Sequence, residues 1–180
     1  MAKDLANVRI YGDTDSAVWV GDVGNAFPSA LAAPSTGWGE VGWISEDGVN
    51  VATDQDSNAF NAWQGGKVVR RRITSSEDTF TFQALEENAL VFGLYYPGST
   101  SNTSTGVTTI TPAEGVSVDE RAFILQLKDG DVEKRYNVAR GEVIERGEIP
   151  HQNTDMTVYE FTVVMYEFVI LTDNPAAEAA

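Results

Sequence analysis

The chain has 180 residues and a formal net charge of −15, from 27 acidic and 12 basic residues. So acidic a protein repels phosphates, which argues against nucleic-acid binding, although acidity also serves ordinary solubility. Because cysteine is absent, the sequence excludes disulfides, cysteine-ligated zinc and thiol catalysis. No stretch reaches the roughly 20 apolar residues of a membrane-spanning helix, and the N-terminus shows no secretory signal, so folding in a cytoplasm is expected.

The first quarter of the chain predicts short strands and an irregular connection. Strands are expected at 7–11 and 16–20, separated by the turn residues Gly-Asp-Thr-Asp at 12–15. The connection at 21–37 is rich in Ala, Pro, Gly and Ser and has no periodicity. Residues 38–44 alternate in character and predict another strand.

Residues 49–66 form a stretch of about 18 residues with little periodicity, which is long for an ordinary connection. We therefore interpret it as a functional loop. Phe60 and Trp63 lie within it, and Trp38 and Trp43 precede it. These aromatics form either a core cluster or anchors of an interface, where Trp is enriched among hot spots.

The next segment predicts a hairpin followed by a short helix. Val68–Thr74 is a β-favouring strand, Ser75–Asp78 are turn residues, and Thr79–Phe82 alternates Thr and Phe as a half-buried strand does. Helical spacing then begins at Leu85 and ends before the breakers Pro97-Gly98.

The last part of the chain predicts strands almost throughout, after a polar loop at 99–106. The Asp129-Gly130 pair is a hairpin signal, and the second half of 156–171 is apolar on both faces, so cover on both sides is expected. Strands are expected at 107–110, 121–128, 132–139, 140–149 and 156–171. The fold class is therefore mainly β, a sandwich or barrel-like domain over residues 1–180 with one short flanking helix and a flexible tail at 174–180.

No residue pattern predicts catalysis, a cofactor or a metal. His151, the single histidine, lies in a polar turn without a nucleophile motif to serve. Asp54, Asp56 and Asn58 resemble the start of a calcium loop, but Ala59 stands where that loop needs glycine, so an ordinary acidic segment is preferred.

Four short motifs in order carry a family resemblance. They are the Ala-Trp-Gln-Gly loop at 62–65, the Val-Arg strand opening at 69–70, the Thr-Phe-Thr-Phe strand at 79–82 and the Glu-Glu-Asn helix start at 86–88. In this order they resemble the major tail tube proteins of long-tailed bacteriophages. The resemblance covers residues 38–98 and continues more loosely to residue 172.

The resemblance implies a structural virion protein and no enzyme. Subunits of this family assemble as hexameric rings, which stack into a tube with a continuous inner β-barrel. The tube conducts DNA without binding it specifically, encloses the tape measure protein, meets tail tip and tail terminator proteins, and assembles in the host cytoplasm. The 49–66 loop and the N-terminal segment correspond to parts that bridge rings. Alternatives are a tail terminator, a type VI secretion tube protein, or a β-sandwich binding module or hydrolase with unmarked carboxylates.

Two sets of residues follow as expectations for such an assembly. Arg70 and Arg72 share one face of a strand and favour ion pairing with acids of a neighbouring subunit. The expected subunit and ring interface comprises Asp54, Asp56, Phe60, Trp63, Arg70 and Arg72. An acidic lumen would repel DNA within about one Debye length, and its candidate side chains are Glu133, Glu142 and Glu145.

Overall fold

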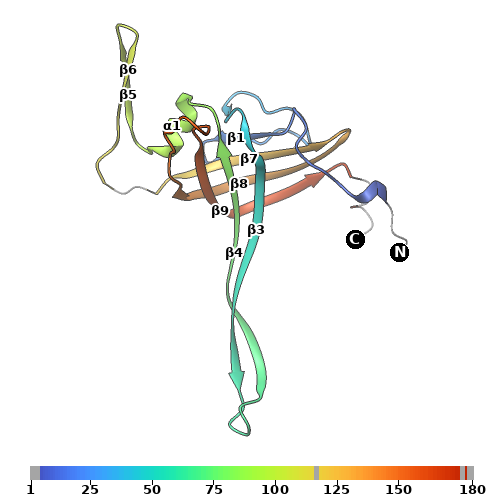
Figure 1. Ribbon diagram of the computed structural model, residues 1–180. Coiled ribbons are helices and arrows are strands. Elements are labelled where there is room, and N and C mark those ends of the chain that lie inside the picture. Colours follow the sequence, from blue (N-terminus) through green and yellow to red (C-terminus); the bar gives the residue numbers. More distant parts are fainter. Residues whose placement is uncertain (1–4, 116–117, 175–176, 178–180) are drawn as a thin grey trace.

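The computed structural model describes residues 5–115, 118–174 and 177 as a mainly β protein. Seven antiparallel strands form one sheet in the order β2-β1-β7-β8-β9-β4-β3 (Figure 1). They are β1 (Ala17–Gly21), β2 (Trp38–Glu40), β3 (Ile44–Asn61), β4 (Val68–Ala84), β7 (Glu120–Asp129), β8 (Val132–Arg146) and β9 (Tyr159–Thr172). A separate hairpin pairs β5 (Thr100–Ser104) with β6 (Val107–Thr111), and a 3-10 turn, η1 (Leu5–Asn7), lies near the N-terminus.

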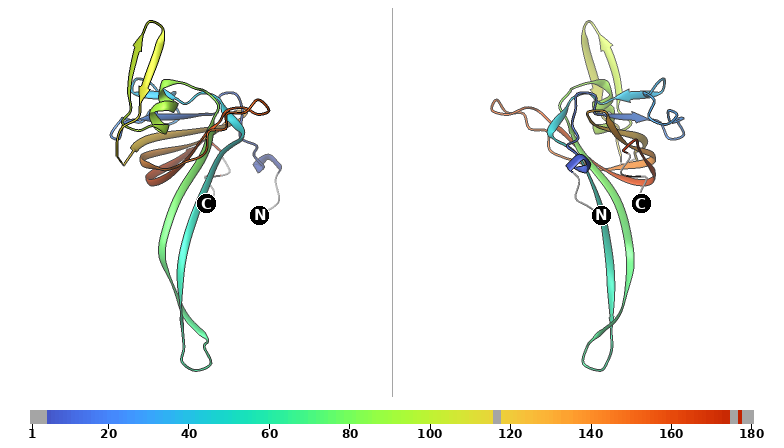
Figure 2. Two further views of the ribbon diagram at one scale, coloured as in Figure 1. Left: turned by 60° about the vertical axis from the view of Figure 1, so that its left-hand side comes forward. Right: turned by 90° about the vertical axis from the view of Figure 1, so that its right-hand side faces the viewer.

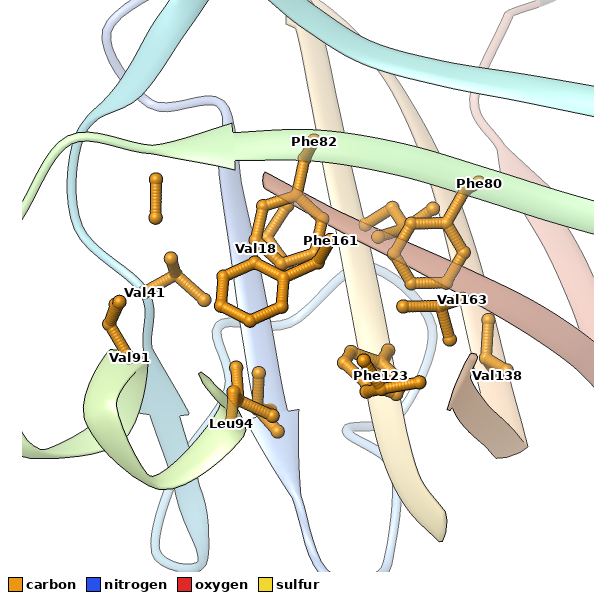
Figure 3. Close-up of a cluster of buried hydrophobic side chains, with 14 of the residues drawn as sticks. Val18, Val41, Phe80, Phe82, Val91, Leu94, Phe123, Val138, Phe161 and Val163 are labelled. Atoms are coloured by element: carbon orange, nitrogen blue, oxygen red, sulfur yellow. The ribbon is translucent and has the colours of Figure 1, made fainter. Parts of the chain in front are cut away.

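The sheet curls around one main hydrophobic core, while Trp38, Ala122 and Ile124 form a second, smaller cluster. Buried side chains from β1, β4, β7, β8, β9 and α1 (Ala89–Tyr95) meet in the main cluster, which a flat sheet could not bring together (Figure 3). Phe123 packs edge-on against Phe80 at 5.3 Å between ring centroids, and Phe161 stacks on Phe82 at 5.2 Å. Such aromatic contacts add stability beyond the area they bury.

Residues 41–43 bring the two ends of the sheet together. The amide of Val41 donates to the carbonyl of Val18 at 2.9 Å, which ties this segment to β1. Two residues later, the carbonyl of Trp43 accepts from the amide of Leu85 at 2.9 Å, which ties it to the end of β4. The body of the protein is therefore barrel-like, with its first and last strands joined by consecutive residues.

Helix α1 covers one opening of this curled sheet. It begins after Asn88, whose side-chain oxygen accepts from the amide of Val91 at 3.0 Å and whose side-chain amide donates to the carbonyl of Val41 at 2.9 Å. Val91 and Leu94 are buried in the core. The predicted single short helix is thus confirmed, with a start four residues later than Leu85.

Two hairpins extend from opposite sides of the body (Figures 1 and 2). The longer is made by β3 and β4. Since β4 pairs with β9 only from Thr79 onward, residues 53–78 have no third strand, and we call them the arm. A register shift between Asp56 and Ser57 leaves Thr74 without a partner and divides the arm. Residues 57–73 beyond it are the tip, and residues 53–56 with 74–78 are the shaft.

Several sequence expectations are wrong at the level of elements. Most of the expected loop at 49–66 is strand, and the Ser75–Asp78 turn is part of the continuous strand β4. The 99–106 loop includes β5 and the turn of its hairpin, while no strand forms at 7–11. The segments at 49–66, 75–78 and 99–106 share one property: little or none of their surface is buried, so no alternation of apolar and polar residues marks them as strands.

Among the described residues, no helix has the length and apolar character needed to cross a membrane. The expected flexible tail at 174–180 falls largely outside the described residues.

Candidate assembly interface

The arm gathers five of the six residues expected at an interface onto one face. Asp54, Asp56 and Phe60 are spaced by even numbers along β3 and so share a face. Phe60 pairs with Arg70. Arg72 pairs with Asn58, which lies on the same face of β3 as Asp56 and Phe60. Asp56 pairs with Ser75, and the unpaired Thr74 shifts the register of β4 by one residue, so Arg72 lies on this same face.

Hydrogen bonds between side chains hold the two strands of the arm in register. Thr53 Oγ1 donates to Asp78 Oδ1 at 2.5 Å, and Ser75 Oγ donates to Asp56 Oδ2 at 3.2 Å. An isolated two-stranded ribbon is only marginally stable in water. A protein that exposes a ribbon of this length therefore offers a surface suited to a partner.

Charge is divided along the arm. The tip holds Lys67 and the arginines at 70–72 and no acid, so all 27 acidic residues of the chain lie elsewhere. None of these four cations forms an ion pair within the described residues. By contrast, six of the other described cations form ion pairs: Arg9, Arg121, Lys128, Arg135, Arg140 and Arg146. The remaining one, Lys134, lies over the ring of Tyr136.

The tip is also rich in exposed apolar side chains. Trp63, in the turn, is 95% exposed, and Phe60 is 51% exposed. The four aromatics near the arm do not form one cluster, because Trp38 is buried against Phe27 while Trp43 is largely exposed at the foot of the arm. Trp63 and Phe60 are thus not part of the subunit core. Of the two interpretations, core cluster or interface anchor, only the second remains open for them.

A second exposed surface lies on the far half of β9. From Met165 to Thr172 this strand pairs only with β8, so its other edge is open. Tyr166, Val169 and Ile170 are each about half exposed. The expectation that this half is covered on both sides is therefore wrong for the isolated subunit.

A groove of about 640 Å³ adjoins this open edge. Phe27, Ala139, Tyr166 and Val169 line it, together with Asn137, whose side chain is only 8% exposed. The Oδ1 atom of Asn137 is buried and accepts no hydrogen bond. Sequence reasoning did not identify this site, although the apolar character of both faces of β9 was the signal for it.

Of the three expected lumen residues, Glu133 lies inside the subunit. It is 7% exposed, and its carboxylate forms an ion pair with the fully buried Arg135 at 2.6 Å. The guanidinium of Arg135 also donates to the carbonyls of Leu31 at 3.1 Å and Ala32 at 2.7 Å. This pair fastens the 22–37 connection onto the sheet, so Glu133 is a structural residue of the subunit.

The other two expected lumen residues reach the surface. Glu145 is exposed, and Glu142 accepts a hydrogen bond from the hydroxyl of Tyr166 at 2.5 Å. This hydrogen bond, with smaller contributions from desolvation and the carboxylate charge, raises the pKa of Tyr166. Glu142 therefore belongs to the same face as the exposed part of β9.

The described residues contain no group of three or more side chains able to hold a metal ion. Asp54, Asp56 and Asn58 lie along a strand and do not wrap a loop, so the calcium interpretation is wrong. His151 is exposed in a connection, as expected for a solvated residue.

Comparison with known proteins gives a family. The sequence model of the family described as "Phage tail tube protein" matches residues 1–174. No curated protein matches. Among the solved structures similar to the chain are chains of a virion of a native gene transfer agent particle (8% identity, 89% of this chain and 97% of that one, TM-score 0.45) and of a baseplate of the anti-feeding prophage (9%, 95% and 97%, TM-score 0.44). Because the family model covers nearly the whole chain, the protein belongs to the phage tail tube protein family, and its role is that of a structural component of a tail.

Proposed function

We propose that this chain assembles as hexameric rings that stack head to tail into the tube of a phage tail, and that it is not an enzyme. The tube serves as a conduit for DNA and encloses a tape measure protein, between a tail tip protein and a terminator protein. Assembly takes place in the cytoplasm of the host. Membership of the tail tube family supports assembly into a tube. The arm is the structural observation that supports the proposed contact between rings.

The arm supports contact between rings because it extends well beyond the body and exposes nearly all of its side chains (Figure 1). Such a ribbon gains stability only from a partner outside its own subunit. The open edge of β9 supports contact within a ring. An unpaired apolar strand edge favours pairing with another chain, and a closed ring removes that edge.

The lumen is proposed to be net negative, with Glu142 and Glu145 as the candidates from β8. The chain carries 27 acids against 12 bases, and a basic wall would bind DNA and hinder its passage. An assembled tube whose lumen is lined mainly by Arg and Lys would overturn the electrostatic part while leaving the tube itself intact.

The test is assembly of the purified wild-type protein and of Trp63→Ala, imaged by negative-stain electron microscopy. Wild type should form long tubes, whereas isolated rings would favour a tail terminator and particles without rings would count against the family role. Trp63→Ala should keep the melting temperature of the subunit, because the side chain is 95% exposed, and should assemble poorly. Truncating an interface hot spot costs at least about 2 kcal/mol.

A matched control is Val107→Ala in the turn region of the β5–β6 hairpin. Val107 is 64% exposed and belongs to β6, whose hairpin extends from the opposite side of the body to the arm (Figure 1). It should leave both stability and tube formation unchanged. Equal loss of tubes in both variants would show that the effect of Trp63→Ala is not specific to the arm.

A further inference from the structure

We propose that the cationic tip of the arm docks into an acidic cavity at the foot of the arm of a second copy of this chain. The inference rests on the proposed tube and specifies which surfaces of successive copies meet. The tip contributes Arg70, Arg72 and Phe60, which share one face, and neither arginine forms an ion pair within the described residues. The receiving surface is a cavity of about 600 Å³ where β1, β2 and the start of β3 meet.

The cavity has the chemistry that a guanidinium group requires. Asp13, Glu40, Glu46 and Glu86 line it, and no basic residue among those that the structure describes does. Neither Glu40 nor Glu46 forms an ion pair within the described residues, and both are exposed. Planar guanidinium groups bind carboxylates through two parallel hydrogen bonds, so arginines fit this lining well.

Two further groups in the cavity lack a partner. The indole of Trp43 is 67% exposed, which offers a flat aromatic surface for stacking by an arginine. The Oγ atom of Ser45 is buried and forms no hydrogen bond, so an incoming donor would satisfy it. One of the acids, Glu86, is held in place locally, since its Oε1 accepts from the amide of Trp43 at 3.0 Å.

The tip cannot reach the cavity of its own chain. Val49 lines the cavity and Phe60 lies on the tip, and the eleven residue steps of extended strand from one to the other span roughly 36 Å. Pairing with β4, interrupted along the arm only by two register shifts, keeps the arm extended away from the body (Figure 2). Arg70 and Arg72 therefore find these carboxylates only on another copy.

Docking of this kind fixes the direction of assembly. The tip and the cavity are different surfaces of one chain, so the contact is heterologous and leaves a free tip at one end and a free cavity at the other. Each added ring repeats the same contact. Since every ring carries several arms, a modest attraction for each arm becomes a strong attraction between rings.

The experiment removes charge from one surface at a time. Arg70→Gln with Arg72→Gln, and separately Glu40→Gln with Glu46→Gln, should each raise the protein concentration needed for tubes at least about tenfold, as measured by sedimentation and electron microscopy. The control, Asn102→Glu with Thr108→Glu on the uncharged β5–β6 hairpin, lowers the net charge by as much as the tip variant and should assemble as wild type. Thermal unfolding confirms that every variant is folded.

Charge exchange then tests whether the two surfaces meet. Arg70→Glu with Arg72→Glu should fail to form tubes alone, as should Glu40→Lys with Glu46→Lys, whereas an equal mixture of the two should form tubes, because each tip then faces a cavity of opposite charge. Tubes from either variant alone, or no tubes from the mixture, would contradict the proposed docking contact. The proposed function as a tube protein depends instead on whether the wild-type protein forms tubes. If the neutral tip variant assembles normally but loses binding to short duplex DNA, the tip is instead a nucleic-acid contact and the proposal fails.

Discussion

The body and the arm of this protein are built from the same kind of strand but depend on different surroundings. In the body, β4 places Phe80 and Phe82 in a core where each is at most 1% exposed. In the arm, the same strand exposes Val69 and Ile73 to more than half of their surface. Within ten residues, the side chains of strand β4 thus change from fully buried at Phe80 to largely exposed at Ile73. Stability of the subunit should depend on the first part, and assembly on the second.

The largest expected contrast is between two phenylalanines. Phe161 is fully buried and packs against Phe82 and Tyr95, so Phe161→Ala should lower the free energy of unfolding of the subunit by about 3–5 kcal/mol. Phe60→Ala in the arm should change it by less than about 0.5 kcal/mol, as exposed substitutions do. Urea denaturation of both variants measures the difference. Similar losses in the two variants would mean that arm and body unfold as one packed unit.

The next expected effect concerns the buried ion pair. Glu133→Ala leaves the guanidinium of Arg135 buried with only carbonyls and an amide oxygen as partners, and should cost about 3 kcal/mol of subunit stability. Asp54→Ala, which removes a carboxylate from the exposed shaft, should cost almost nothing. The two substitutions remove the same charge, so their comparison by chemical denaturation separates a structural carboxylate from a surface one. A negligible effect at Glu133 would argue against its structural role.

The smallest expected effect appears at alkaline pH. Burial, followed by the hydrogen bond from its hydroxyl to Glu87, raises the pKa of Tyr159 from 10.0 to about 12. The stability that this tyrosine contributes is therefore complete below pH 10 and is lost as the pH rises toward 12. Tyr159→Phe should lose less stability than wild type across that range, measured by urea denaturation at each pH. Parallel losses in the two proteins would mean that other groups determine the alkaline limit.

The sequence predicts the body well and the arm poorly, for one physical reason. Thr79–Phe82 alternates because one face of β4 is buried, and Asn88 precedes the helix because it caps it. The residues at 75–78 have the composition of a turn, yet hydrogen bonds to Thr53 and Gln55 across the ribbon hold them extended. A strand exposed on both faces has no alternation to reveal it.

The candidate interface was accessible from sequence only in part. The types of residue at Phe60, Trp63, Arg70 and Arg72 indicated an interface, and the structure adds that three of them share a face. The cavity at the foot of the arm could not be predicted, because residues 11–17, 40–49, 86 and 126–127 meet there only through the curl of the sheet.

The length of the arm has a consequence for the dimensions of the proposed assembly. Because the two strands are extended, the reach of the arm follows from its number of residues. Roughly 36 Å separates Val49 from Phe60 along β3. In the proposed tube, where the arm bridges rings, this length would set the scale of the spacing between rings, and each added ring would lengthen the tail by one such step.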